Sequence, residues 1–244
     1  MRSVATLISS ALFSLSLAAT AQATTVLVEL SGTISSVFQV GSGGAGVSIA
    51  NTFSVGDTVS GSFVYDTEGT LISGNDYSAV TGVSVTINGL SFSSSSDRVR
   101  ILNDFGGLQE DNIQFGFGRN AASGPIVNGH SPFSLNYSMR AFSSGPNGSS
   151  PLSDNSLPDR ATFDSFVQAV QANGVFGLAI DFTSPDDPSG QQGVERVFAR
   201  FDSVQVNEIA AVPLPASLPL LFLGTCGIVG LRQRRNYLGL PTGT

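Results

Sequence analysis

Apolar and polar residues alternate with a period of two along most of residues 24–209, which is typical of strands that bury one face. The predicted inward positions are Val26, Val28, Leu30 and Ile34; Val59, Phe63 and Tyr65; Val83, Val85 and Ile87; Ile113, Phe115 and Phe117; Phe133, Leu135, Tyr137 and Met139; Phe176, Leu178, Ile180 and Phe182; and Val197, Ala199, Phe201, Val204 and Val206. Asn88-Gly89 favours a type I′ hairpin turn, followed by a return strand at Leu90 and Phe92.

One segment has a helical period instead. Phe163, Phe166, Val167 and Val170 are spaced as one helix face, and Gly174 follows as a stop signal. Many short strands with one helix predict an all-β domain over residues 24–209, an antiparallel β-sandwich of jelly-roll type. The predicted loops are too short to separate two domains; they are Gly41–Gly46, Ser93–Ser96, Ser143–Pro151 and Ser184–Gly190.

The N-terminus has the parts of a secretory signal peptide. Met1-Arg2 is a short basic region, and residues 4–18 are apolar with interspersed serines. Ala21-Gln22-Ala23 matches the small-residue cleavage site, with Ala21 and Ala23 at its key positions. We therefore expect residues 1–23 to direct export through the Sec machinery and to be removed; a buried N-terminal helix is the alternative.

The C-terminal region predicts a short membrane segment. Thirteen residues from Pro219 to Leu231 are mostly apolar and would form a helix of about 20 Å. The hydrocarbon core of a bilayer is about 30 Å thick, so this helix suits transient rather than permanent retention. Arg232, Arg234 and Arg235 would remain on the cytoplasmic side as stop-transfer residues.

The residues before this helix read Val212-Pro213-Leu214-Pro215-Ala216. Together with the helix and the arginines, residues 212–236 resemble the VPLPA variant of the PEP-CTERM sorting domain of Gram-negative bacteria. The resemblance implies that an exosortase, a membrane transpeptidase-like cysteine protease, recognises these five residues. It also implies a link to exopolysaccharide, and Phe53–Asp66 looks like a segment that recurs in proteins of this kind. The tail 237–244 extends further beyond the arginines than is usual in the family.

Charge and cysteine content narrow the function further. The chain has no lysine, and its formal net charge is −7. Loss of both terminal segments would leave seven arginines against eighteen acidic residues, a net charge of −11, which disfavours binding to nucleic acid. Cys226 is the single cysteine, so an internal disulfide is excluded. We interpret it as a small helix residue; lipidation or an intermolecular disulfide is the alternative.

Catalytic patterns are weak. His130 is the single histidine, no G-x-S-x-G sequence occurs, and its turn-like surroundings predict an exposed loop histidine. The neighbouring pairs Glu110-Asp111 and Asp186-Asp187 are predicted to be solvated. Acids on separate strands, such as Glu29 and Asp181, could converge as a glycosidase pair. We predict that the protein is not an enzyme and assign no catalytic residue.

No cofactor is expected, although a structural calcium ion could use oxygen ligands from several loops. Ordinary solubility is the preferred explanation of the same acids, which are Asp57, Asp66, Asp76, Asp104, Asp111, Asp186 and Asp187.

The sequence thus predicts a non-enzymatic envelope or matrix protein of a Gram-negative bacterium, held briefly in the inner membrane and then located in the envelope, at the cell surface or in the extracellular matrix. One alternative is a carbohydrate-binding module with a surface around Asp76-Tyr77 or Asn136-Tyr137, with Tyr and Phe as stacking residues because tryptophan is absent. A glycan-active hydrolase is a further alternative.

Overall fold

The computed structural model describes residues 25–41, 48–105, 110–142, 150–191 and 193–209. Ala23–Ile209 group into one compact unit. The predicted signal peptide, sorting segment and tail lie outside the described residues, and so does Cys226. In the part of the chain that is described, no helix is both long enough and apolar enough to cross a membrane.

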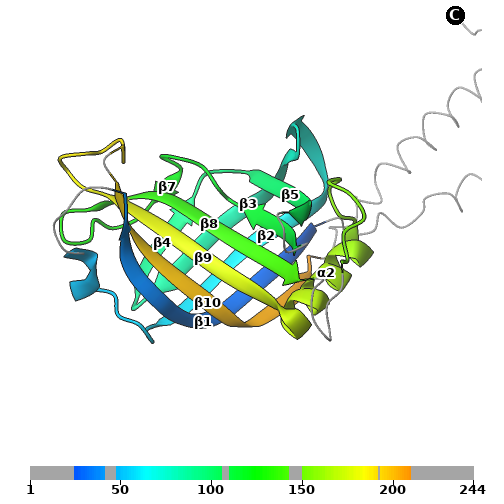
Figure 1. The fold of residues 1–244 in the computed structure, drawn as a ribbon, viewed down its shortest axis with the longest axis horizontal. Coiled ribbons are helices and arrows are strands. Elements are labelled where there is room, and N and C mark those ends of the chain that lie inside the picture. The colour runs from blue at the N-terminus through cyan, green and yellow to red at the C-terminus, as the bar shows by residue number, and fades with distance from the viewer. Residues whose placement is uncertain (1–24, 42–47, 106–109, 143–149, 192, 210–244) are drawn as a thin grey trace, which may run out of the picture. The chain divides into compact units, whose positions relative to one another are not determined.

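Strands make up most of the described chain (Figure 1). They are β1 (Thr25–Val40), β2 (Thr58–Ser73), β3 (Asp76–Ile87), β4 (Leu90–Ser94), β5 (Arg98–Phe105), β6 (Glu110–Phe115), β7 (Ala122–Ser123), β8 (Ser131–Phe142), β9 (Gly174–Thr183) and β10 (Val194–Glu208). The helices are the 3₁₀ turn η1 (Ser48–Asn51) and the α-helix α2 (Arg160–Asn173). The prediction of an all-β domain with one amphipathic helix is confirmed.

All these strands belong to one antiparallel sheet, which closes on itself because β2 also pairs with β3. Around the ring the strands follow chain order, β1-β2-β3-β5-β6-β8-β9-β10, and β10 returns to β1. We expected two separate sheets; instead, opposite walls of one closed sheet face each other across the core. Closure pairs the edge strands, whose backbone groups would otherwise remain open to other chains.

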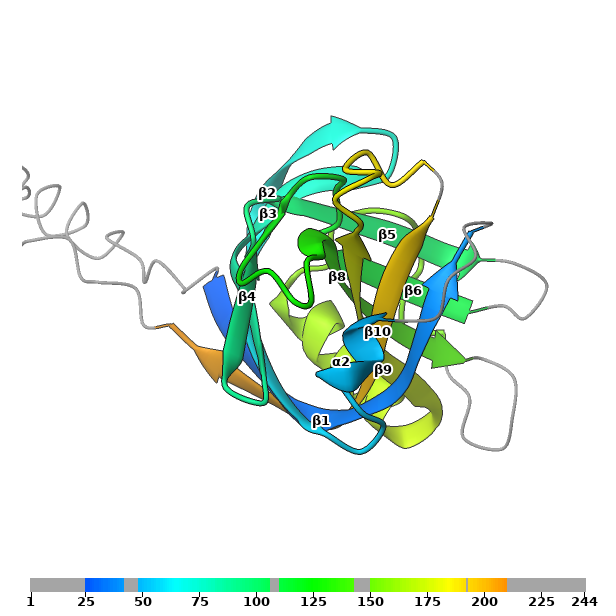
Figure 2. The same cartoon turned by 90° about the vertical axis from the view of Figure 1, so that its left-hand side faces the viewer.

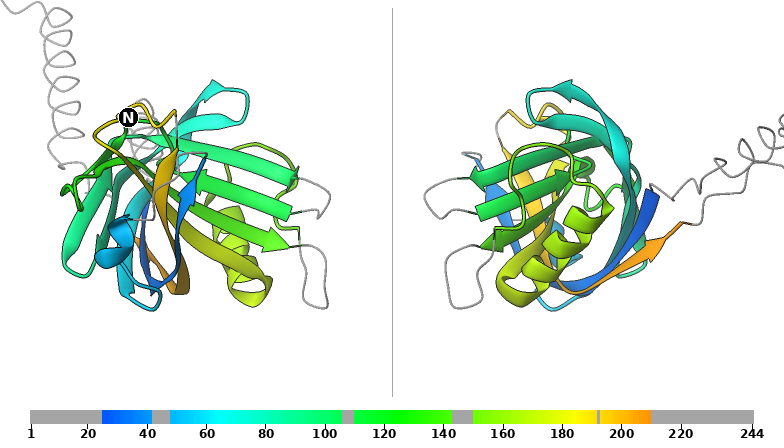
Figure 3. Two further views of the ribbon diagram at one scale, coloured as in Figure 1. Left: turned by 60° about the vertical axis from the view of Figure 1, so that its left-hand side comes forward. Right: turned by 90° about the vertical axis from the view of Figure 1, so that its right-hand side faces the viewer.

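The interior is filled by the apolar residues of the period-two pattern, and the predicted inward positions from Val26 to Phe201 are almost all buried. Aromatic rings dominate the centre: the rings of Phe63 and Phe115 stack at 4.4 Å, and those of Tyr65 and Phe163 at 4.5 Å. Helix α2 supplies Phe163 and lies across one end of the ring, whereas η1 lies near the other end (Figures 2 and 3).

The sequence correctly predicted the β3–β4 turn and the end of helix α2, and it predicted one loop only in part. Asn88 and Gly89 both have positive φ, at 50° and 80°, and join β3 to β4 as the predicted two-residue turn. The Asp159 side chain accepts a hydrogen bond from the Thr162 N–H and so caps α2, which ends before Gly174 as expected. The predicted loop Ser93–Ser96 is wrong in part, because β4 continues through Ser94.

Tyr137 on β8 forms a hydrogen bond across the core to β3 on the opposite wall of the closed sheet. Its side chain is completely buried, and its hydroxyl donates a hydrogen bond to the Ser84 carbonyl of β3 at 2.5 Å. Burial raises the pKa of this phenol well above its usual range, so the hydroxyl remains a donor. The Tyr137 side chain fits because Gly61 on β2 has no side chain: a Cβ at position 61 would overlap the Tyr137 hydroxyl.

We predict that Gly61→Ala lowers the free energy of unfolding by about 2 kcal/mol, because it overpacks this site. Tyr137→Phe alone should cost about 1 kcal/mol for the lost hydrogen bond. In the double variant the added methyl no longer meets a hydroxyl, so the loss should be smaller than the sum of the two. Chemical denaturation measures all three; Ser60→Ala, an exposed change on the same strand, serves as control. Strictly additive losses would contradict the proposed steric contact.

Candidate functional site

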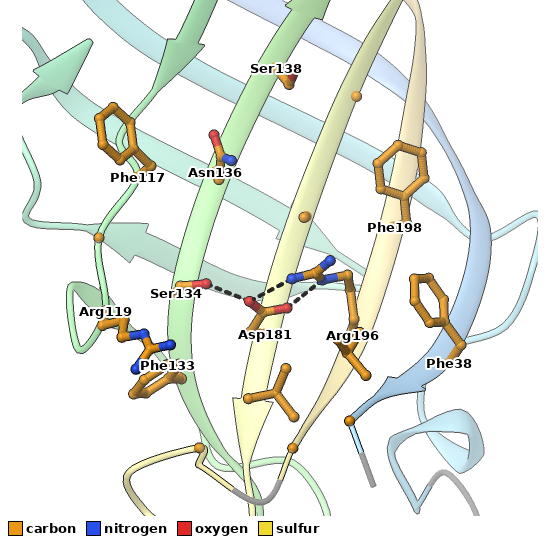
Figure 4. Close-up of a pocket in the computed structure, with 18 of the residues that line it drawn as sticks. Phe38, Phe117, Arg119, Phe133, Ser134, Asn136, Ser138, Asp181, Arg196 and Phe198 are labelled. Carbon is orange, nitrogen blue, oxygen red and sulfur yellow. Dashed lines mark hydrogen bonds and ion pairs between the residues drawn. The ribbon is translucent and has the colours of Figure 1, made fainter. Parts of the chain in front are cut away.

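A groove of about 950 Å³ lies on the outer surface of the ring, over β1, β10, β9 and β8 (Figure 4). On the strands, it is formed mostly by side chains that alternate with the core residues. A second hollow of about 480 Å³ lies between β1, β2 and β3, and no aromatic residue lines it. The first groove is therefore the stronger candidate for a binding site.

The strand register arranges the floor of the groove in rows. One row contains Ser134, Asp181 and Arg196 on β8, β9 and β10. The next row contains Asn136, Ala179 and Phe198 in the same strand order. The central strand contributes small residues at Gly177 and Ala179, so the floor is low between the larger side chains of its neighbours.

Phenylalanine side chains flank this polar floor. Phe38 and Phe198 lie on one side, and Phe117 and Phe133 lie on the other (Figure 4). The Phe198 ring lies over Gly177, where a Cβ would come within 2.8 Å of the ring. Phe38 is 39% exposed although it is a large apolar residue. Phe117 and Phe198 are half-buried, and Phe133 is buried. Aromatic side chains beside polar groups are suited to ligands with both apolar and polar surfaces.

An ion pair occupies the middle of the groove. The Arg196 guanidinium donates to both carboxylate oxygens of Asp181, at 2.6 and 3.0 Å. Ser134 Oγ donates to the same carboxylate at 2.8 Å. The hydrogen bond with Asp181 raises the pKa of Arg196, so the arginine is permanently charged. These contacts hold both charged groups in fixed positions at the floor.

Asn136 has an unused hydrogen-bonding atom. Its Oδ1 is buried and has no hydrogen-bond partner within the described residues. The side chain points outward between Ser134 and Ser138 and lines the groove. A buried amide oxygen without a donor is costly, and rotation of the side chain toward the groove would let a ligand hydroxyl supply the missing donor.

A second ion pair supports the wall at Phe117. Arg100 donates to both oxygens of Asp76, at 2.6 and 2.9 Å, and this hydrogen bonding lowers the pKa of Asp76. The Arg100 guanidinium lies 4.5 Å from the centre of the Phe117 ring, a cation–π distance. Phe117 was predicted as an inward strand residue. That is wrong, because β6 ends at Phe115 and Gly116 turns the chain with φ of 70°.

The predicted carbohydrate-binding surfaces are corrected by the structure. Asp76 and Tyr77 begin β3; Asp76 is occupied by Arg100, and the Tyr77 hydroxyl donates to the Asn155 carbonyl. Tyr137 lies in the core, so of the pair Asn136-Tyr137 only Asn136 reaches the groove. Neighbouring residues on a strand point to opposite faces, which is why neither pair forms one surface.

The two acids considered as a glycosidase pair, Glu29 and Asp181, do not come together. Glu29 pairs with Gln205 and Asp181 with Arg196, nine positions apart along β10, which separates them by roughly 30 Å. The prediction that Glu110-Asp111 is solvated is wrong, because both are buried at the start of β6.

The buried Asp111 carboxylate accepts hydrogen bonds from the Asp104 and Leu152 backbone N–H groups, which fasten the chain before α2 to the sheet. Asp186 and Asp187 do lie in a turn, as expected.

His130 is more enclosed than an exposed loop histidine, with 15% of its side chain accessible. Its Nδ1 lies 3.1 Å from Ser48 Oγ, and its Nε2 lies 3.6 Å from the Glu195 carboxylate. Glu195 also accepts directly from the Ser48 hydroxyl and from the backbone N–H groups of Ser48 and Ile49. The Ser48 hydroxyl therefore donates its hydrogen bond to Glu195. Together with the backbone bonds to Ser48 and Ile49, this holds η1 against β10.

The acids considered as calcium ligands are dispersed. Asp57 accepts from the Ser54 N–H and from Asn88, and Asp66 accepts from the Glu68 N–H. Within the described ranges, no group of three or more potential metal-ligating side chains occurs.

The predicted sorting and cleavage residues lie outside the described residues; they are Ala21, Ala23, residues 212–216 and the three C-terminal arginines. No protein-family model, curated protein or solved structure matches the chain. The groove itself was missed in the sequence. The sequence feature that could have revealed the groove is Phe198, a large apolar residue at an outward position of its strand, together with the small residues Gly177 and Ala179.

Proposed function

We propose that the protein is an exported, non-enzymatic envelope or matrix protein that binds polysaccharide chains through the outer groove. The observation that carries this proposal is the groove in which phenylalanine side chains flank a polar floor that contains the unpartnered Asn136 Oδ1. Sugars present apolar C–H faces and a dense set of hydroxyl groups. Aromatic rings bury the former, and amide, hydroxyl and carboxylate groups bond the latter.

The openness of the groove favours a chain over a small molecule. The floor crosses the neighbouring strands from β8 to β1, so the groove extends across several strands. A polymer could enter sideways and extend beyond both ends. A polymer can bind many copies of the protein along its length, and these repeated contacts would retain a matrix component even if each one is weak.

Export and sorting rest on the sequence. The signal peptide at 1–23 would direct the chain out of the cytoplasm, and the VPLPA-like segment 212–236 would retain it in the inner membrane until an exosortase cuts near Val212–Ala216. Delivery to the surface would bring the groove to the exopolysaccharide that the family resemblance implies.

The groove is tested by glycan-array screening and titration calorimetry of the full-length protein. Phe198→Ala removes the ring over Gly177 and Asn136→Ala removes the buried oxygen; each should weaken glycan binding at least about tenfold. Matched controls outside the groove are Leu71→Ala, an exposed apolar residue on β2, and Asn207→Ala, an exposed amide on β10. Equal loss in the controls, or unchanged affinity in the groove variants, would exclude this surface.

Sorting is tested by replacing Val212–Ala216 with alanines. The altered protein should accumulate uncleaved in the inner membrane, because the exosortase would lack its recognition sequence. The measurement is the mass of the protein in fractionated cells, with alanines at Leu240–Thr244 as a control block of equal length. If the altered protein keeps the processed mass and surface location of the unaltered one, the sorting proposal is wrong.

A further inference from the structure

The groove has the opposite charge to the rest of the domain. Between residues 25 and 209 there are seven arginines and eighteen acidic residues. Three of those arginines, at positions 119, 140 and 196, line the groove, and the one acidic residue that lines it is Asp181. The internal segments outside the described residues contain no charged residue, so they do not alter this balance.

Two of the three arginines have no acidic partner. Within the described residues, neither Arg119 nor Arg140 forms an ion pair, and both are exposed. Arg140 donates from Nε to Ser138 Oγ at 3.3 Å, and its guanidinium forms no ion pair within the described residues. Arg196 donates hydrogen bonds from Nε and one terminal nitrogen to Asp181. Arg98 and Arg200, outside the groove, also form no ion pair within the described residues, so what distinguishes the groove is that three arginines line it beside a single acidic residue.

The arginines are also spread along the groove. Arg196 lies in the row of Ser134 and Asp181, whereas Arg140 lies on β8 beyond Ser138, about 20 Å further along that strand than Ser134 by residue spacing. Arg119 lies on the opposite side from Phe38 (Figure 4). Positive charge therefore recurs along an elongated path rather than at one point.

Building on the proposed function, we infer that the groove selects acidic polysaccharides, in which carboxylate-bearing uronic acid residues recur along the chain. The arginine fork matches a carboxylate in a bidentate geometry. The phenylalanine faces and Asn136 contact the sugar rings, and the arginines bind the carboxylates. The acidic remainder of the surface repels a polyanion that is not seated in the groove, which adds selectivity.

The test is titration calorimetry of the full-length protein with oligomers of galacturonate and of mannuronate. The same oligomers with their carboxylates methyl-esterified, and poly-glutamate of equal charge, are the comparison ligands. At least one uronate oligomer should bind about tenfold more tightly than its methyl ester and than poly-glutamate, because the ester lacks charge and the peptide lacks sugar rings. Affinity should fall as salt rises.

Arg119→Gln and Arg140→Gln should each weaken uronate binding about five- to tenfold without changing the unfolding midpoint, since both side chains are exposed. Arg98→Gln, an exposed arginine on β5 outside the groove, is the matched control and should bind as the unaltered protein does. A Phe198→Ala change should weaken binding to uronate and ester alike.

The outcomes separate the two proposals. Equal affinity for uronate and methyl ester overturns the selectivity for acidic chains and leaves polysaccharide binding intact. Equal or tighter binding of poly-glutamate overturns it in favour of an acidic polypeptide partner. If the protein binds neither the uronates nor any sugar of the glycan array, both the selectivity and the proposed polysaccharide binding are wrong.

Discussion

The closing pair of strands, β2 with β3, determines how the rest of the domain is built. Closure gives every strand of the ring two neighbours and divides the side chains of each strand into an inner and an outer set. The inner set fills the ring with aliphatic and aromatic residues, including the Tyr137 side chain that spans it. Since the inner set fills the core, the outer surface of β8, β9 and β10 can carry polar and charged groups.

The period-two pattern was sufficient for the strands and their inward residues, the Asn88-Gly89 turn and the α2 helix. It could not decide between two packed sheets and one closed sheet, because either gives each strand one buried face. That decision lies in long-range register, such as the pairing of Tyr65 with Val80 and of Val28 with Val206, which a local pattern does not record.

The candidate site was harder to predict for the same reason. Asn136 and Tyr137 were considered as one surface, yet alternation places them on opposite faces, and only the amide reaches the groove. Arg119, Arg140 and Arg196 are far apart in sequence and meet through the pairing of neighbouring strands and the turn after β6. His130 was expected to be exposed, but Glu195 and Ser48 come from segments that are distant in sequence and are brought beside it by the pairing of β1, β10, β9 and β8.

We propose that the chain is exported and sorted, and that its acidic domain binds a polysaccharide at the basic, aromatic-flanked outer face of β8, β9 and β10. Photo-cross-linking of a uronate oligomer to the full-length protein, followed by peptide mapping, tests this most directly. We expect adducts in the segment that contains Phe117 and Arg119 and in the segment from Asp181 to Phe198, and excess unlabelled oligomer should suppress them. Suppressible adducts confined to β2, β3 and β4, on the opposite wall, would contradict it.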